Sequence, residues 1–356
     1  MNGNQNKTLI LLKGKKFIDK CLNNHNITKI YMIDVKPIIS AIIPVYNSEK
    51  TIYSSVKSIQ YQDYTDFEII LIDDFSNDNS SKIIERLQEK DKRIKILKNK
   101  RNMGSLYSRS IGLLVSRGKY IFPLDNDDLF FSDDIFNIIL KIARQYNFDI
   151  VGFRALGIGN YENTNIEKMK DLYNYQLYPN KTIIYQPKLS TWMITVNGQY
   201  QPHDVTIWAK CIKSNIYRQA IFKLGIKRYS TFVSWGEDTI TNFIIFSLAK
   251  SFIFVHIYGI IHLNNFSTAS FSMPNKILLF GEIFFVDILY DFLKNNDDKN
   301  YAVMGVYHVK RMFKINKFFN STNLIYLKSI LNKIINCQYI SKENKEKIRN
   351  DFKTFF

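Results

Sequence analysis

The chain has 356 residues, of which 46% are hydrophobic and 15% aromatic, and its formal net charge is +17. This apolar content excludes a largely disordered chain, because buried apolar surface can offset the entropy that is lost on folding. Three widely separated cysteines, Cys21, Cys211 and Cys337, exclude a disulfide framework and a zinc module. Most of the surplus positive charge lies in residues 1–36 and 294–356, so the central region is close to neutral.

The apolar runs of the chain are too short or too charged for membrane insertion. The run from Leu9 to Leu12 is interrupted at Lys13, and the longer stretches 239–263 and 277–293 contain charged residues. The sequence therefore predicts a cytoplasmic protein without a signal peptide or transmembrane helix. Its basic C-terminal helices are expected to rest on an anionic membrane face.

Between residue 37 and about residue 155, short apolar runs alternate with helical patterns, which is typical of a parallel α/β sheet. The predicted strands are Ile38–Val45, Phe67–Ile72, Ile94–Leu97, Tyr120–Leu124 and Asp149–Phe153. The predicted crossover helices are Glu49–Tyr61, Ser80–Lys90 and Ser105–Ser116.

The second half of the chain is less regular. Residues 156–200 are predicted to form an irregular insertion, and the last eighty residues are predicted to be helical and basic. Between these parts we expect a strand at Val205–Cys211, helices at Ser214–Leu224 and Asp238–Lys250, and a strand at Phe252–His262.

Acidic residues follow two of the predicted strands, at the sheet edge where open parallel sheets bind ligands. Three carboxylates occur within Asp125–Asp128, and their mutual repulsion favours a bound divalent cation. A helix cap near Ser132 is the structural alternative. Asp73 and Asp74 form a second acidic turn, in which Asp73 could accept a hydrogen bond from a nucleobase or a ribose.

Five motifs in this order resemble the nucleotide-sugar-binding half of family 2 glycosyltransferases, which have the GT-A fold. They are IIPVYN from Ile42, IILIDDFSND from Ile69, NKRNMGSLYSRSIGL from Asn99, GKYIFPLDNDD from Gly118, and WGED from Trp235. The resemblance implies an α/β, Rossmann-like GT-A sandwich with an irregular acceptor region and a helical C-terminal extension.

The resemblance implies a nucleotide pocket at the ends of the first two strands. Pro44, Val45, Tyr46 and Asn47 would form its lip, with Tyr46 against the base. Asp73 would meet the uracil or the ribose, with Asp74 beside it. Arg109 would reach the base or the diphosphate; its alternative role is that of a surface arginine in a basic protein.

The resemblance also implies a metal site and a catalytic base. Asp125 would contact the ribose and the metal, with Asn126 beside it, and Asp127 would bind Mn²⁺ or Mg²⁺ at the diphosphate. A late histidine, His262, would add a metal or diphosphate ligand. Asp238 would be the general base, with Glu237 orienting it or the acceptor, although both could instead cap a helix.

The implied activity is the metal-dependent transfer of a sugar from a nucleotide-diphosphate donor to an acceptor hydroxyl, with inversion of the anomeric centre. The sugar would be of the hexosyl or N-acetylhexosaminyl type, and the expected donor is UDP-linked. The acceptor would be a glycan, a glycoprotein or a lipid-linked molecule. Trp192, Trp208 and Trp235 lie in the region expected to meet it, with core packing as their alternative role.

This activity would divide the chain into a basic N-terminal extension (1–36), a nucleotide-sugar-binding half (37–155), an acceptor and catalytic-base half of the same domain (156–272), and a basic helical region (273–356). A nucleotidyltransferase is the enzymatic alternative, but it would require a Gly-rich basic loop where this chain has Tyr46-Asn47-Ser48-Glu49. A basic nucleic-acid-binding protein is the other alternative. No common nucleic-acid-binding signature occurs, so no nucleic-acid partner is expected.

Overall fold

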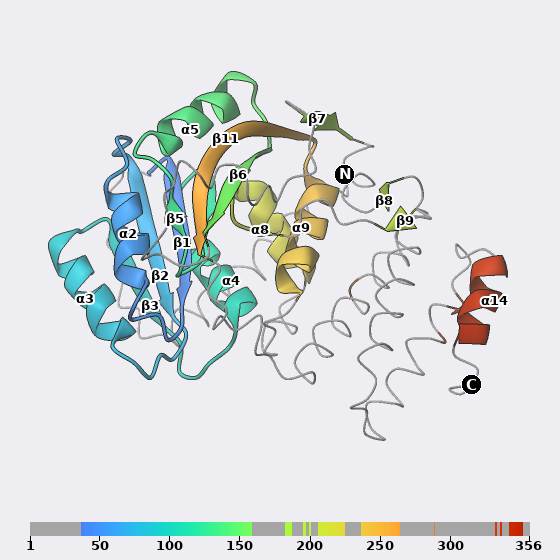
Figure 1. Cartoon of the computed structure of the whole chain (residues 1–356), viewed down its shortest axis with the longest axis horizontal. Coiled ribbons are helices and arrows are strands. Elements are labelled where there is room, and N and C mark those ends of the chain that lie inside the picture. Colours follow the sequence, from blue (N-terminus) through green and yellow to red (C-terminus); the bar gives the residue numbers. More distant parts are fainter. Residues whose placement is uncertain are drawn as a thin grey trace, which may run out of the picture.

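The computed structural model describes residues 37–158, 182–186, 195–196, 199–200, 206–224 and 236–263, together with the helix α14 (Lys342–Asp351) and a few isolated residues of the C-terminal region. The expectations for the N-terminal extension, for Trp192 and Trp235, and for most of residues 273–356 lie outside these ranges. Within them, a mixed sheet lies between two layers of helices (Figure 1).

The first part of the chain alternates strands and helices as predicted. Its elements are β1 (Ile39–Val45), α2 (Ile52–Gln60), β2 (Phe67–Asp73), α3 (Ser80–Lys90), β3 (Ile94–Lys98), α4 (Ser105–Val115) and β4 (Tyr120–Pro123). The second part has β5 (Leu129–Phe130), α5 (Ile135–Gln145), β6 (Ile150–Ile158), β7 (Thr182–Tyr185), β10 (Lys210–Lys213), α8 (Ser214–Leu224), α9 (Glu237–Leu248) and β11 (Ser251–Leu263). A separate hairpin pairs β8 (Thr195–Val196) with β9 (Gln199–Tyr200).

The large sheet has the strand order β3-β2-β1-β4-β10-β6-β11-β5, and β7 pairs with β11. Strands β1 to β4 are parallel, which confirms the prediction for this part of the chain. Strand β10 is antiparallel to both β4 and β6, while β6 and β11 are parallel to each other. The carboxyl ends of β1, β2, β4, β6 and β11 therefore meet at one edge of the sheet, where the predicted site residues lie.

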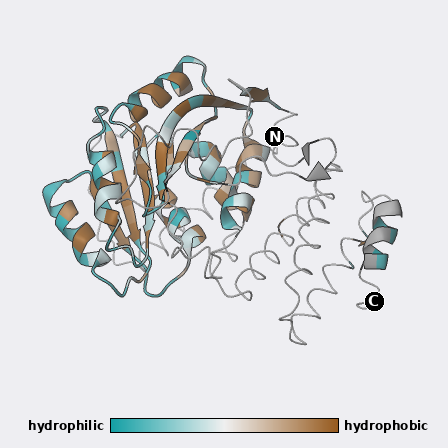
Figure 2. Ribbon diagram, viewed as in Figure 1, coloured by the Kyte–Doolittle hydropathy of each residue, from teal (hydrophilic) through white to brown (hydrophobic). Residues whose placement is uncertain are grey.

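Successive side chains of the buried strands point to opposite faces of the sheet, and both faces are apolar. On one face, the odd-numbered residues of β1 from Ile39 to Val45 share a core with α2, α3 and α5. On the other face, α4 packs closely at Gly112, where an added Cβ would lie 2.8 Å from Ile42 and 2.6 Å from Ile72. Figure 2 shows the corresponding pattern, with mainly hydrophobic strands and two-sided helices. None of the described helices has the length and apolarity needed to cross a membrane.

The strand predicted at Val205–Cys211 is misplaced. The structure begins β10 at Lys210 and ends it at Lys213, and Ile207, Trp208 and Ala209 form a buried bend in which Ala209 has a φ of 55°. An apolar run has the same appearance in a buried strand and in a buried loop, so the hydrophobic pattern could not distinguish them.

The backbone at Gly118, just before β4, lies very close to the backbone of Ser40 in β1, and this contact predicts how a substitution at Gly118 affects stability. A Cβ on Gly118 would lie 2.5 Å from the backbone nitrogen of Ser40, and backbone cannot move aside as a side chain can. We expect Gly118→Ala to lower the free energy of unfolding by about 1–3 kcal/mol, measured by urea denaturation. Lys119→Ala is a control that changes the neighbouring exposed residue without adding an atom at this contact; equal stability of the two variants would contradict the prediction.

Candidate active site

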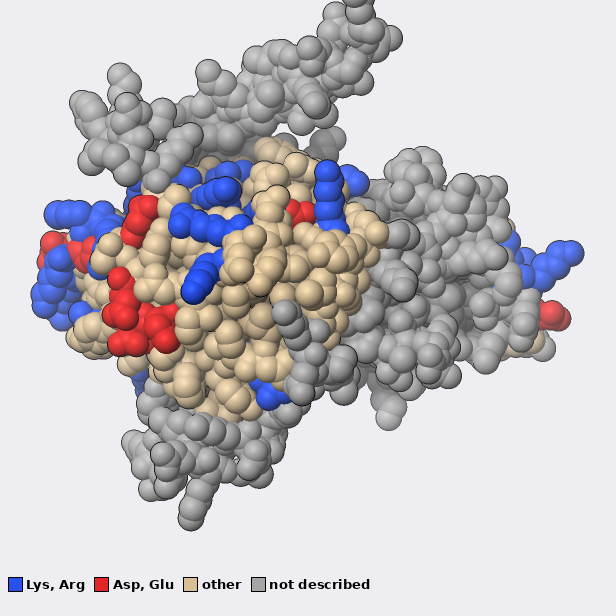
Figure 3. All heavy atoms as spheres, turned by 90° about the horizontal axis from the view of Figure 1, so that it is seen from above, with Lys and Arg blue, Asp and Glu red and all other residues tan. Residues whose placement is uncertain are grey.

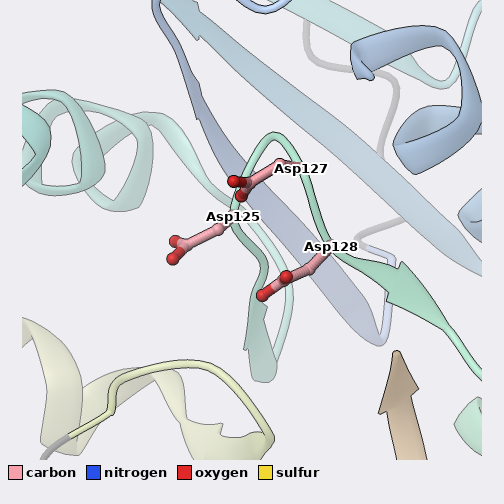
Figure 4. Close-up of side chains that lie close together, drawn as sticks. All are labelled: Asp125, Asp127 and Asp128. Carbon is pink, nitrogen blue, oxygen red and sulfur yellow. The ribbon is translucent and has the colours of Figure 1, made fainter. Parts of the chain in front are cut away.

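Three acidic side chains gather on the loop that follows β4. The parallel pairing with β1 continues to Leu124, whose N–H donates to the carbonyl of Ile42 at 3.1 Å, and the chain then turns over Asp125–Asp128. Asp125, Asp127 and Asp128 each offer a carboxylate oxygen, and these oxygens lie within 4.8 Å of one another. Figure 4 shows the three side chains on this one loop at the edge of the sheet.

The electrostatics of this cluster suit a hard divalent cation. Burial, together with the negative charges of Asp128 and Asp125, raises the pKa of Asp127 to about 7. The Oδ2 atom of Asp128 is fully buried and has no hydrogen-bond partner in the described part of the chain. Closely spaced carboxylates with an unused buried oxygen match the all-oxygen coordination of Mg²⁺ or Mn²⁺. The residues present therefore fit the metal that the sequence predicts.

His262 lies beside this cluster near the end of β11. Its Nδ1 atom is 2.7 Å from Oδ1 of Asp128, and its ring stacks on Trp208 with the ring centroids 4.8 Å apart. Burial alone would lower the pKa of His262, but the hydrogen bond and charge of Asp128 raise it to about 9. His262 is therefore a partner of Asp128, and its role as a direct metal ligand stays a prediction.

Arg109 of α4 connects the acidic loop to α9. It is 6% exposed, and its Nη2 group pairs with Asp125, whereas Nη1 lies 2.9 Å from Asp238 and 3.8 Å from Glu237. Although burial alone would lower the pKa of Arg109, the three carboxylates raise it, so the guanidinium stays charged. The surface-arginine alternative is thus excluded. In this structure Arg109 binds the site's own acids, and its predicted contact with the base or diphosphate remains untested.

Glu237 and Asp238 open α9 behind Gly236, whose φ is 73°. Their carboxylates bond to other parts of the chain: Ser105 Oγ donates to Glu237, and the backbone N–H of Ile207 donates to Asp238 at 3.2 Å. Burial raises the pKa of Asp238 to about 7, against the opposing charge of Arg109. Burial also raises the pKa of Glu237. A carboxylate that titrates near neutral pH can accept a proton during a reaction.

The predicted nucleotide residues lie at the ends of β1 and β2. Pro44 and Val45 are buried within β1, and Tyr46 is half-exposed just beyond it. Asn47 follows in a left-handed conformation, with a φ of 46°, and its Oδ1 accepts the N–H of Asn77 at 2.8 Å. Asn126 lies in the acidic loop, and its backbone carbonyl accepts the hydroxyl of Ser55 at 2.9 Å.

Asp73 and Asp74 are buried and act as acceptors inside the protein. Asp73 accepts the backbone N–H of Ser76 at 2.9 Å and the hydroxyl of Ser81. Asp74 accepts the N–H groups of Met103 and Gly104 at 2.8 and 2.7 Å, and the amide of Asn99 at 2.7 Å. Asp74 therefore shapes the loop that leads into α4 and Arg109. The predicted contacts of both acids with a nucleotide are not tested by this geometry.

Comparison with known proteins identifies this part of the chain. Residues 40–198 match the model of the family described as glycosyl transferase family 2. Residues 40–198 therefore form a family 2 glycosyltransferase domain. A relative in Haemophilus influenzae, described as an uncharacterized glycosyltransferase, is 38% identical over 131 residues, which are 37% of this chain and 50% of that protein. The chain thus spans about half the length of this curated relative.

Solved structures confirm the GT-A fold. TarS of S. aureus, crystallised with UDP-GlcNAc, has a TM-score of 0.60 and 14% identity, over 87% of this chain and 83% of the TarS chain. GalNAc-T7, crystallised with UDP, GalNAc and Mn²⁺, has a TM-score of 0.50 and 15% identity, over 89% and 55% of the two chains.

Some neighbours of the candidate site could not be found in the sequence. Ser105, which binds Glu237, lies within the motif that starts at Asn99 but has no role assigned there, and no motif contains Ile207, whose N–H binds Asp238. Trp208 is 7% exposed and packs on His262, so the core-packing alternative applies to it.

Figure 3 shows basic and acidic side chains side by side over the described part of one face, in keeping with the nearly balanced charge of the central region.

Proposed function

We propose that this family 2 glycosyltransferase moves a sugar from a UDP-linked donor to an acceptor hydroxyl, with Asp238 as the general base. The observation that carries the proposal is the arrangement around Arg109. Its guanidinium pairs both with Asp125 of the acidic cluster and with Asp238, a half-buried carboxylate whose pKa is raised to about 7. The UDP-GlcNAc and UDP named with the solved neighbours support a uridine nucleotide.

In this proposal Asp127 and Asp125 hold Mn²⁺ or Mg²⁺, and Asp128 completes the acidic set with His262 beside it. The Mn²⁺ named with GalNAc-T7 supports the choice of metal. When bound, the ion offsets the negative charge that develops on the diphosphate leaving group. The protein's part is to keep these carboxylates together at the end of β4, with Asp128 buried and Asp125 and Asp127 half-buried.

Asp238 takes the proton from the acceptor hydroxyl as its oxygen bonds to the anomeric carbon. The bond from that carbon to the diphosphate oxygen breaks in the same step, and its electron pair leaves with the nucleoside diphosphate. A single displacement of this kind inverts the anomeric centre. Asp238 is held for this role by Arg109 and by the N–H of Ile207, and Glu237 beside it orients the acceptor or the base.

The finer predictions belong to this proposal as well. The donor sugar is of the hexosyl or N-acetylhexosaminyl type, and the acceptor is a glycan, a glycoprotein or a lipid-linked molecule. The protein is proposed to act in the cytoplasm, where its basic C-terminal region would contact an anionic membrane face. Equal binding to neutral and anionic vesicles at low salt would contradict that contact.

The direct test is to incubate the purified protein with Mn²⁺ and a panel of nucleotide sugars, and to measure release of nucleoside diphosphate. We expect slow hydrolysis of a UDP-sugar that Asp127→Ala abolishes. No turnover with any donor, together with salt-sensitive binding to RNA or DNA, would replace the proposal with a nucleic-acid-binding function.

The raised pKa of Asp238 predicts the pH dependence of this activity. A base works only when deprotonated, so kcat/KM should rise with pH, reaching a plateau above about pH 8 and falling to about a tenth of it near pH 6. Asp127 also titrates near pH 7, but saturating Mn²⁺ would keep it deprotonated and shift its titration to lower pH. If the rise of kcat/KM stays centred near pH 7 at saturating Mn²⁺, this supports Asp238 as the base. A rise centred below pH 5.5 would contradict this assignment.

A further inference from the structure

Phe75 is held in a backbone conformation that bulky residues avoid. It follows Asp73 and Asp74 at the end of β2, its φ is 67°, and 50% of its surface is exposed. For a residue with a Cβ, the left-handed region is sterically unfavourable, and glycine or asparagine is the usual occupant. Because half of the residue is exposed to solvent, packing of its side chain against the core offsets little of this backbone strain energy. Unfavourable backbone of this kind is concentrated at functional sites.

The turn around Phe75 is fixed on both sides. Asp73 accepts the N–H of Ser76 at 2.9 Å, and Asp74 is held by bonds to the loop before α4. The same turn is tied to the end of β1, because Ser76 Oγ accepts the N–H of Asn47 at 3.2 Å and Asn47 Oδ1 accepts the N–H of Asn77 at 2.8 Å. The strained conformation is therefore imposed by a rigid frame.

This frame presents two aromatic side chains at neighbouring strand ends. Tyr46, which is 42% exposed, follows β1, and Phe75 follows β2, its hydrogen-bonded neighbour in the sheet. Both lie at the carboxyl edge of a parallel sheet, which is where such sheets bind ligands. Exposed aromatic faces held on a rigid frame suit a flat heterocycle, since stacking on an aromatic ring is favourable for every nucleobase.

We propose that Phe75 is a binding residue for the nucleobase of the donor and forms, together with Tyr46, an aromatic platform. The inference rests on the proposed use of a nucleotide donor and adds a contact to it. Phe75 shares its turn with Asp73 and Asp74, whereas the proposed base Asp238 lies on α9, so the nucleotide is favoured over the acceptor as the partner of the ring.

The test is Phe75→Gly, for which binding and stability should change in opposite directions. Glycine adopts a φ of 67° without strain, so the melting temperature should stay at the wild-type value or rise by about one or two degrees. The dissociation constant of UDP with Mn²⁺, and that of uridine, should increase about five- to tenfold, while inorganic pyrophosphate should bind as before. The binding measurements are made by titration calorimetry.

Two further variants separate the ring from the backbone. Phe75→Tyr keeps an aromatic face, and we expect it to bind UDP within about twofold of the wild type. Asn147→Gly relieves a left-handed residue, with a φ of 53°, just before β6 at the opposite edge of the sheet, and should leave UDP binding unchanged.

Unchanged UDP and uridine affinity in Phe75→Gly would overturn the inference, and so would equally weak binding by Phe75→Tyr. A lower melting temperature in Phe75→Gly would also overturn it, because the ring would then be a packing element. If only the KM for the acceptor changes, the ring belongs to the acceptor site and the inference is wrong. None of these outcomes affects the proposed function, which fails only if wild-type protein turns over no nucleotide sugar.

Discussion

Asp238→Asn is expected to lower kcat by about 10²–10⁴-fold, because the amide cannot accept the proton of the acceptor hydroxyl. The shape of the side chain is kept, and its oxygen can still accept the N–H of Ile207. Burial raises the pKa of Asp238, so folding already disfavours its charge at neutral pH, and the melting temperature should not fall. The measurement is initial rate against both substrates, with thermal unfolding in parallel.

The KM for the donor should change little in Asp238→Asn, which separates loss of the base from loss of the donor site. The matched control is Asp133→Asn, the same chemical change at an exposed acid close to the acidic loop Asp125–Asp128. We expect it to leave kcat unchanged. Wild-type turnover by Asp238→Asn would assign the base to another group, with Glu237 the nearest candidate.

Asp127→Asn is expected to reduce turnover by about 10²–10³-fold, because it would weaken binding of the proposed metal ion that would stabilise the leaving group. The deficit should shrink as Mn²⁺ is raised, and the dissociation constant for Mn²⁺, measured by calorimetry without any nucleotide, should increase. The thermal stability of Asp127→Asn, in contrast to its turnover, should increase. At pH 7.5 the Asp127 charge is disfavoured in the folded, metal-free protein by burial and by its acidic neighbours, so removing the charge should raise the melting temperature.

A loss of turnover in Asp127→Asn with unchanged Mn²⁺ affinity would contradict the assigned role of Asp127. The melting temperature provides the second criterion. If it falls by several degrees, Asp127 is a structural residue of the loop, and the acidic cluster is held together by its own hydrogen bonds.

The sequence predicted the strands and helices around the site well, because each rests on a local pattern. Helices α3 and α8 match the predicted limits, and the acidic loop follows β4 as expected. The hydrophobic period determines where a buried strand ends, and the end of a buried parallel strand determines where ligand-binding side chains lie. These features require no knowledge of distant partners.

The partners of each acid could not be predicted, because they come from distant parts of the chain. Arg109 meets Asp125 on the next loop but also Asp238, which lies 129 positions further on. The sequence predicts that Asp73 and Asp74 bind a ligand. In the structure, however, their carboxylate oxygens accept hydrogen bonds from the turns that precede α3 and α4. A carboxylate that binds a ligand and one that organises a loop have the same local sequence.

Strand β10 has a consequence for how this chain can be divided into fragments. It lies between β4 and β6, so residues 210–213 join two strands that come from residues 39–158, and β11 from residues 251–263 pairs with the other side of β6. A fragment that stops near residue 155 would expose the facing edges of β4 and β6, which are open to pairing with other chains. Chimeras that exchange segments between relatives should therefore place the junction after Leu263, so that β10 and β11 stay with the sheet that they complete.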